Sequence, residues 1–196
     1  MTTLRLLASL AGLLVLQANG GALPSDGVKE GVWWQSAPRD ERLGYLAGYI
    51  DCAVYDAGKD MGRQSWYSLA PKISAQYAKR SDKLMQPVSA ILKELVSAEA
   101  VRHGEEGGEH YDEKHGFFDG EYWRRGGGEH RLGFIEGYLD CWKTEGVKGG
   151  KFSMPAGKYV ALLSDWFGIS ANDPRMVRAD RATKKIAEAL WIFRDR

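Results

Sequence analysis

Residues 42–52 read Arg-Leu-Gly-Tyr-Leu-Ala-Gly-Tyr-Ile-Asp-Cys, and residues 131–141 read Arg-Leu-Gly-Phe-Ile-Glu-Gly-Tyr-Leu-Asp-Cys. The second segment follows the first by 89 positions, and the same shift relates Gly31-Val-Trp33-Trp34 to Gly120-Glu-Tyr122-Trp123. This agreement at matched positions indicates a tandem duplication. Two copies of one module are expected to pack about a pseudo-two-fold axis, as identical patches do in a homodimer.

Apolar residues recur at helical spacing in both copies, which predicts an all-α fold. After the duplicated motif, a second helix is expected over 68–78 and 157–167, with Tyr77 matching Trp166 at the same shift of 89. A third helix follows Pro87 in the first copy and Pro174 in the second, because proline suits a first helical turn. We therefore predict two tandem three-helix modules, related by a pseudo-two-fold axis and packed as one domain, since each half alone is too small for a sufficient core.

The first 22 residues have the layout of a secretory signal peptide. Arg5 precedes an apolar run over 6–16, and small residues follow at Ala18, Gly20 and Ala22. This run is shorter than the roughly 20 apolar residues that cross a bilayer, so we expect no transmembrane segment. The predicted organisation is a signal peptide over 1–22, a first module over 23–102, a linker over 103–119 and a second module over 120–196. The protein is expected to be exported, either to the periplasm or out of the cell.

The chain carries 27 basic and 26 acidic residues, a formal net charge of +1. Balanced charge does not favour electrostatic capture of nucleic acid, so no nucleic-acid partner is expected. Seven tryptophans, nine tyrosines and six phenylalanines supply much apolar area, which favours a folded globular protein. The aromatic pairs at 33–34 and 122–123 are expected to pin a segment onto the helical core, with stacking on sugars as the alternative.

The repeated motif places two glycines and a cysteine at intervals of four, so on a helix they share one face. A glycine inside a helix costs about 1 kcal/mol relative to alanine, which indicates a compensating close approach of two backbones. We assign helix packing to four glycines, Gly44, Gly48, Gly133 and Gly137. If the two helices cross near the axis, Cys52 and Cys141 meet, and in an exported chain a disulfide between them is predicted. The alternative is two buried free thiols on separate faces.

Asp51 and Asp140 precede the two cysteines inside predicted helices, where aspartate is a mediocre helix former. Two acids that meet across the axis would raise one pKa and support acid–base chemistry, which makes both residues candidate functional acids. The structural alternative is that each aspartate binds an arginine, Arg42 or Arg131, or caps a neighbouring backbone. Because a single active site rarely needs both copies of every residue, we favour the structural role and assign no catalytic residue.

The segment between the copies is rich in glycine, glutamate and histidine. Four of its residues are candidate ligands for zinc or another divalent metal, namely His103, Glu106, His110 and His115. Their spacing matches no standard site, and Gly107-Gly108 disfavours a helix that would align them. A solvated linker without a bound cofactor is therefore the preferred interpretation.

Motifs of the second half resemble those of small helical periplasmic immunity proteins, which neutralise type VI secretion amidase effectors. They comprise residues 133–140, Pro155-Ala156-Gly157, residues 159–167, Asp173-Pro174 and residues 186–190. Residues 44–51, Tyr77 and residues 91–95 repeat the series more faintly in the first half. Members of that family resemble single modules, often dimeric, so this chain corresponds to a fused pair. The resemblance implies a helical fold, export and a binding role, and it identifies no binding residue.

Taken with this resemblance, the sequence predicts an exported binding protein, with a cell-wall hydrolase that it inhibits as the implied partner. One alternative is an exported enzyme that uses Asp51 and Asp140 or the histidine- and glutamate-bearing linker. The other is an envelope structural or ligand-binding protein that binds sugars through its aromatic pairs.

Overall fold

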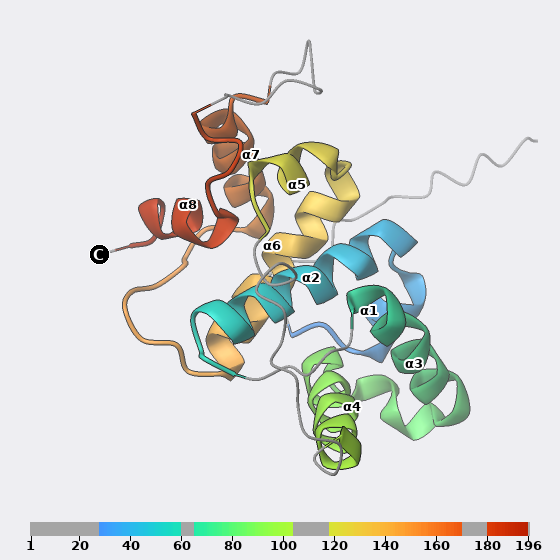
Figure 1. Ribbon diagram of the computed structural model, residues 1–196. Coiled ribbons are helices and arrows are strands. Elements are labelled where there is room, and N and C mark those ends of the chain that lie inside the picture. Colours follow the sequence, from blue (N-terminus) through green and yellow to red (C-terminus); the bar gives the residue numbers. More distant parts are fainter. Residues whose placement is uncertain (1–27, 60–64, 104–117, 170–179, 196) are drawn as a thin grey trace, which may run out of the picture.

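Helices build the fold in the computed structural model of the protein, which describes residues 28–59, 65–103, 118–169 and 180–195 (Figure 1). The α-helices are, in chain order, α1 (Gly31–Ser36), α2 (Arg39–Tyr55), α3 (Trp66–Lys79), α4 (Val88–His103), α5 (Gly120–Arg125), α6 (Gly128–Thr144), α7 (Ala156–Phe167) and α8 (Ile186–Ile192). A short 3₁₀ helix, η1 (Ser81–Met85), lies between α3 and α4. The predicted all-α class is therefore confirmed for this part of the chain.

Each half of the described chain holds four α-helices, one more than predicted. The additional ones are α1 and α5, which have 6 residues each and carry the aromatic pairs. Fewer than two turns are too short to show a helical period in the sequence. Asp119 caps α5 by accepting a hydrogen bond from the backbone N–H of Tyr122 at 2.9 Å. Antiparallel bridges, Glu30 with Pro87 and Asp119 with Lys185, tie the start of each half to the beginning of its last helix.

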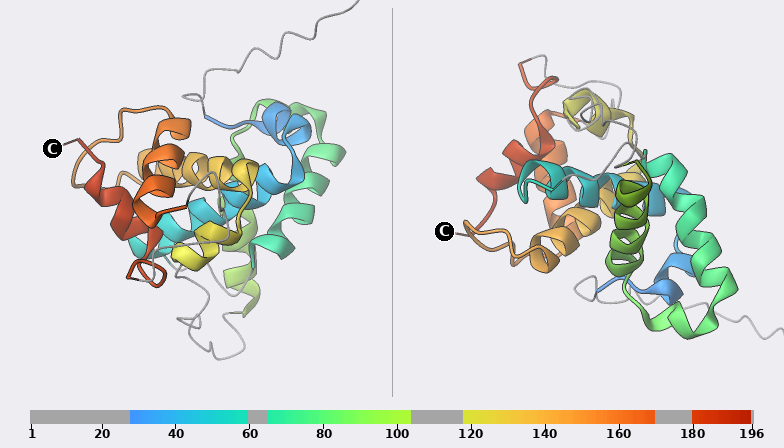
Figure 2. Two further views of the ribbon diagram at one scale, coloured as in Figure 1. Left: turned by 90° about the horizontal axis from the view of Figure 1, so that it is seen from above. Right: turned by 60° about the horizontal axis from the view of Figure 1, so that its bottom comes forward.

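The two long helices of the duplicated motif, α2 and α6, form the centre of the fold (Figure 1). Each has 17 residues. They run in the same direction, because the glycine contacts pair the early and middle turns of one helix with those of the other and the cysteines meet near the ends. Figure 2 shows α3 and α4 on one side of this pair and α7 and α8 on the other. The hydrophobic core is continuous through all of these helices.

The backbones of α2 and α6 approach most closely at the four repeated glycines. A Cβ atom added to any of them would lie closer than 3.0 Å to a carbonyl oxygen of the other helix. For Gly44, Gly48, Gly133 and Gly137 these oxygens belong, in that order, to His130, Phe134, Glu41 and Tyr45. Only the hydrogen atom of glycine fits there, so the two helix axes come closer than ordinary side chains allow.

The helices α3 and α7 hold corresponding places beside α1 and α5. A Cβ atom on Gly31 would meet the ring of Tyr77, and a Cβ atom on Gly120 would meet the ring of Phe167. Phe167 is fully buried, whereas Trp166 is only partly buried. The predicted match of Tyr77 with Trp166 is therefore wrong by one residue. The shift becomes 90 (167 − 77), because the second copy has one residue more between its duplicated motif and the following helix.

The predicted signal peptide over 1–22 and all but the ends of the predicted linker over 103–119 lie outside the described residues. The module boundaries stay predictions. None of the helices in the described ranges is both long enough and apolar enough to cross a membrane.

Candidate functional site

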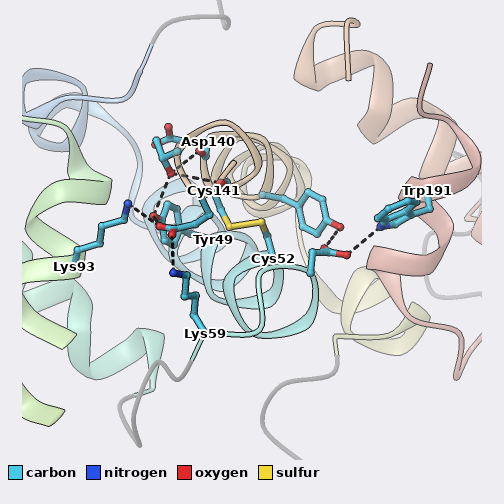
Figure 3. Close-up of a disulfide and its surroundings, with 11 residues drawn as sticks. Tyr49, Cys52, Lys59, Lys93, Asp140, Cys141 and Trp191 are labelled. Atoms are coloured by element: carbon cyan, nitrogen blue, oxygen red, sulfur yellow. Dashed lines mark hydrogen bonds and ion pairs between the residues drawn. A yellow bond between two sulfur atoms is a disulfide. The ribbon is translucent and has the colours of Figure 1, made fainter. Parts of the chain in front are cut away.

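Cys52 and Cys141 form a disulfide between α2 and α6 (Figure 3). Their Cα atoms are 6.1 Å apart, which is within the usual range for a disulfide, and both residues are fully buried. The bond joins the last turns of the two helices, whose early and middle turns are held together by the glycine contacts. The central helix pair is therefore fixed at both ends.

Acidic side chains near the disulfide receive hydrogen bonds from tyrosines of the opposite half. Tyr49 of α2 donates to Glu145 at 2.9 Å. Tyr138 of α6 donates to Asp56, which also accepts from the indole N–H of Trp191 at 3.0 Å. Figure 3 shows Tyr49 and Trp191 on opposite sides of the disulfide. The two tyrosine bonds correspond, because Tyr138 follows Tyr49, and Glu145 follows Asp56, by the repeat shift of 89.

Glu145 is the centre of a small group of charges beside the disulfide. Its carboxylate lies 2.6 Å from Nζ of Lys93 and 3.7 Å from Nζ of Lys59, and both lysines point toward Tyr49 in Figure 3. Burial by itself raises the pKa of Glu145, but the hydrogen bonds from Lys93 and Tyr49 outweigh it and hold the pKa below its ordinary value. The carboxylate thus stays ionised at neutral pH and links α4 to the end of α6.

Asp140, one of the two candidate functional acids, accepts a hydrogen bond from the hydroxyl of Tyr45 across the helix crossing. Burial raises the pKa of the Asp140 carboxyl, and the bond from Tyr45 opposes that shift. Burial and the neighbouring Asp140 charge raise the pKa of Tyr45 well above its ordinary value, so the hydroxyl keeps its proton and remains a donor. Asp140 therefore joins α6 to α2.

Asp51, the other candidate acid, is 2% exposed and has different surroundings. The backbone N–H of Phe118 donates to its carboxylate, while Oδ2 has no partner among the described residues. Burial raises the pKa of Asp51 well above its ordinary value, and the charge of Asp56 adds to the shift, whereas Lys185 opposes it. Asp51 and Asp140 thus have separate partners, and the structure does not bring them together as an acid pair.

The arginines expected to bind these acids lie elsewhere. Arg131 donates to the carbonyl oxygen of Trp123 at 2.8 Å, and its guanidinium is 5.8 Å from the centroid of that ring. The guanidinium of Arg42 is 5.6 Å from the centroid of Trp34. The predicted aspartate–arginine pairs are therefore wrong. Nine residues separate Arg42 from Asp51 (51 − 42), about 13 Å along a helix, and since α2 and α6 are parallel, the arginine of the other copy is equally distant.

The second member of each aromatic pair belongs to the core, as expected. Trp34 and Trp123 are each 1% exposed. Their indole N–H groups donate to Ser74 at 3.0 Å and to Ser164 at 3.2 Å, respectively. Burial with a satisfied donor is a packing role, so these two rings cannot stack on a sugar.

None of the four candidate metal ligands has a described side chain, so the structure does not test whether they come together. Glu106, His110 and His115 fall outside the described residues, and His103 ends α4 without a described side chain. Within the described ranges, no three histidine, cysteine, aspartate or glutamate side chains are grouped so as to hold a metal ion. The metal site stays a prediction.

A groove that sequence reasoning missed crosses the first turns of α2 and α3 and the junction of α5 with α6. It consists of two adjoining cavities of about 340 and 380 Å³, which share Arg39, Leu43 and Tyr67 as lining residues. We call it the basic groove and define it by six side chains: Arg39, Arg42, Trp66, Tyr67, Tyr122 and Arg125.

Positive charge dominates the basic groove. Among the described residues that line either cavity, Asp40 is the one carboxylate, against three arginines. His130 also lines the groove, and burial lowers its pKa, so its ring is neutral at neutral pH. Its Nε2 is 2.7 Å from the hydroxyl of Tyr122. None of the described residues forms an ion pair with Arg39 or Arg125.

The groove was not predictable from periodicity, because segments far apart in the sequence contribute its side chains. One signal was available in the comparison of the two copies. At the shift of 89, Arg39 corresponds to Gly128 and Arg125 corresponds to Ser36, so these two cations are not part of the repeat.

No protein-family model matches the chain, and no curated protein or solved structure is significantly similar to it.

Proposed function

We propose that the protein is an exported binding protein, and that it inhibits a cell-wall hydrolase as the immunity proteins it resembles do. The observation that carries this proposal is that the repeated acids are hydrogen-bonded between the two halves. Asp56, Asp140 and Glu145 are hydrogen-bonded to tyrosines of the opposite half. Carboxyl groups committed to holding helices together are poorly placed to exchange protons with a substrate. This supports binding as the function, in preference to catalysis.

We propose further that the two halves are modules related by a pseudo-two-fold axis between α2 and α6, so that the chain corresponds to a fused dimer. The bond from Tyr49 to Glu145 supports this, because a shift of 89 relates it to the bond between Tyr138 and Asp56. The reciprocal glycine contacts support it in the same way. A fused pair keeps one fixed arrangement that separate modules would reach only by association.

Export is part of the same proposal. A disulfide such as Cys52–Cys141 persists in an oxidising compartment, which the periplasm and the cell exterior provide. Residues 1–22 would act as the signal peptide and be removed. An inhibitor of a cell-wall hydrolase has to act in the compartment that contains the wall, so location and proposed partner are consistent.

The test uses the oxidised chain without its first 22 residues as bait for an envelope extract from its own source. We expect the bait to retain a peptidoglycan hydrolase in equimolar amount, and one equivalent of the protein to abolish cleavage of purified peptidoglycan by that enzyme. The matched control is the same bait after reduction and alkylation in denaturant. A hydrolase that binds both baits equally, or that stays active in the complex, contradicts the proposal.

A second candidate function, an exported enzyme, is favoured by Asp51. A buried carboxyl with a raised pKa, one oxygen of which has no partner among the residues that the structure describes, is the type of group that catalytic sites contain. Release of soluble fragments from peptidoglycan by the protein itself would support this candidate. Loss of that release in Asp51→Asn, with an unchanged circular dichroism spectrum, would establish it over the inhibitor.

A further inference from the structure

The basic groove contains a supported aromatic surface. The ring of Trp66 lies edge-to-face against Tyr122, with 6.2 Å between centroids, and against Phe118, with 4.9 Å. Tyr67 extends this surface outward, because its ring centroid is 5.3 Å from that of Trp66 and the residue is 56% exposed. Rings held in place by neighbours present an apolar face with little loss of side-chain entropy on binding. The surface suits a small ligand with one apolar face.

Two buried N–H groups in residues that line the groove have no acceptor within the described part of the chain. They are Nε of Arg42 in the smaller cavity and Nε1 of Trp66 in the larger. Unpaired buried donors are uncommon in folded proteins, so each one calls for a partner. Both atoms are almost fully covered by protein, so binding includes a shift of neighbouring side chains, after which the oxygen acceptors of a ligand would supply these partners.

Cationic and backbone donors add to these two groups. Arg39 lines both cavities and Arg125 lines the larger one. A guanidinium group binds a carboxylate through two parallel hydrogen bonds. Gly127, which lines the larger cavity, caps α6 without a side-chain hydrogen bond, and a Cβ atom on Gly127 or Gly128 would meet no described atom within 4 Å. The N-terminus of this 17-residue helix therefore lies beside the groove with open space next to its first two glycines, which favours an anion there.

Two of the three arginines of the groove, Arg39 and Arg125, have no arginine at the equivalent position of the other copy, whereas the third, Arg42, is repeated as Arg131. Features that the fold needs occur in both copies, as the glycines, the cysteines and the aspartates do. Arg39 and Arg125, by contrast, are replaced by Gly128 and Ser36 at the equivalent positions. The fold therefore forms around these positions without an arginine, and the two charges are available for a function.

We propose that the basic groove binds a sugar that carries a carboxylate, such as a uronic acid unit of an acidic glycan. Arg39 and Arg125 hold the carboxylate, the ring face packs on Tyr67 and Trp66, and hydroxyl oxygens accept hydrogen bonds from the N–H groups of Trp66 and Arg42. The larger cavity, about 380 Å³, is within the range of about 300–1,000 Å³ that is usual for small-molecule sites. This site requires no hydrolase partner, so it stands or falls independently of the inhibitor proposal.

The experiment is a calorimetric and tryptophan-fluorescence titration of the oxidised protein with trigalacturonic acid. We expect saturable binding at one site. Arg39→Gln and Arg125→Gln should each weaken it at least about tenfold, as expected for the loss of a charge-assisted hydrogen bond. Trp66→Phe keeps an aromatic ring but removes Nε1, so it should weaken binding by a smaller factor. Lys158→Gln is the matched control, because it removes an exposed cation from α7 and should leave the affinity unchanged.

Three further ligands test whether the groove recognises both the carboxylate and the sugar. A neutral chitotriose that binds as tightly as the uronate would overturn the proposal, because the carboxylate would then not be recognised. Inorganic phosphate or a short acidic peptide that binds as tightly would overturn it as well, because no sugar would be needed. So would an absence of saturation at millimolar uronate, or an equal loss of affinity in Lys158→Gln. Circular dichroism of every variant shows that the fold is kept, and Arg39→Lys, which keeps the charge, should have intermediate affinity.

Discussion

The hydroxyl of Tyr45 in α2 donates a hydrogen bond to the carboxylate of Asp140 in α6, and both side chains are buried. At the repeat shift of 89, the residue that corresponds to Tyr45 is Phe134, which has no hydroxyl. The acid that corresponds to Asp140 is Asp51, which has a backbone donor from Phe118, while its Oδ2 has no partner in the described ranges. The two copies therefore bury the same aspartate in different ways, and the difference traces to one oxygen atom.

Without the hydroxyl of Tyr45, the buried carboxylate of Asp140 has one hydrogen-bond donor fewer. We expect Tyr45→Phe to lower the free energy of unfolding by about 1–3 kcal/mol, measured by urea denaturation at neutral pH. Tyr67→Phe is the control, because Tyr67 is 56% exposed and its replacement should change stability by less than about 0.5 kcal/mol. If the two variants are equally stable, the bond between Tyr45 and Asp140 contributes nothing to folding.

Asp51 should make the fold less stable as the pH rises. Burial raises its folded-state pKa, whereas the pKa in the unfolded chain is about 3.9, so between these values the folded state binds more protons. The free energy of unfolding therefore falls as the pH increases above about 4, until the folded pKa is passed. Asp51→Asn cannot ionise and keeps an acceptor for Phe118. In this variant the free energy of unfolding should therefore fall less with rising pH. Urea denaturation series recorded from acid to neutral pH measure this difference.

Glu145 should change the stability with pH in the opposite direction to Asp51, and it serves as the comparison. Its folded pKa is lowered by Lys93 and Tyr49, which outweigh burial. Its contribution to stability is present above the unfolded pKa and is lost as the pH falls through the folded one. Glu145→Gln should thus lose stability mainly at neutral pH. For Asp51, the contrary result is a free energy of unfolding that falls as steeply with rising pH in Asp51→Asn as in the unmodified protein. It would show that Asp51 is ionised in the folded state.

The glycines of the helix crossing should not tolerate a methyl group. In Gly48→Ala the new Cβ would lie closer than 3.0 Å to the carbonyl oxygen of Phe134, so α2 and α6 would have to separate. We expect a loss of about 1–3 kcal/mol or more in the free energy of unfolding. Gly157→Ala in α7 is the control, since no described atom lies within 4 Å of its added Cβ, and it should stabilise the protein by about 0.4–1 kcal/mol. Equal effects at both positions would contradict the close approach of the helices.

The disulfide should contribute strongly to stability, because Cys52 and Cys141 are 89 residues apart in the chain. In the chain-entropy account, a loop of this length gives about 4.6 kcal/mol, and we expect Cys52→Ala/Cys141→Ala to lose an amount of that order in urea denaturation. Intact mass measured under denaturing conditions should rise by two hydrogen masses on reduction. A mass that does not change would show that the two cysteines are not bonded to one another.

The helix crossing was predictable because its determinants are local. Glycines at intervals of four mark one face of a helix, and a cysteine four positions further on that face is repeated in the other copy. A duplication brings equivalent positions together if the copies pair about an axis, so the pairing of Cys52 with Cys141 followed from the sequence. The short helices α1 and α5 were not predicted, since 6 residues are too few to show a period.

The acids mark the limit of such reasoning. Asp51 and Asp140 are equivalent in sequence, and the difference between Tyr45 and Phe134 becomes informative only when the structure shows that Tyr45 reaches Asp140. Their partners, the Phe118 backbone and the Tyr45 hydroxyl, come from other elements and depend on how α2 and α6 cross. Arg42 and Arg131 were expected as partners and instead lie on the rings of Trp34 and Trp123, as parallel packing of the two helices requires.

The sequence by itself determined the duplication, the helical class, the face on which the two central helices meet and the cysteine pair, because each of these depends on residue spacing along one helix. Only the tertiary structure decided which donor each buried acid receives and where Arg39, Trp66 and Arg125 come together as the basic groove. These relationships join side chains from different helices, and the distances between helices are set by the packing of the whole core.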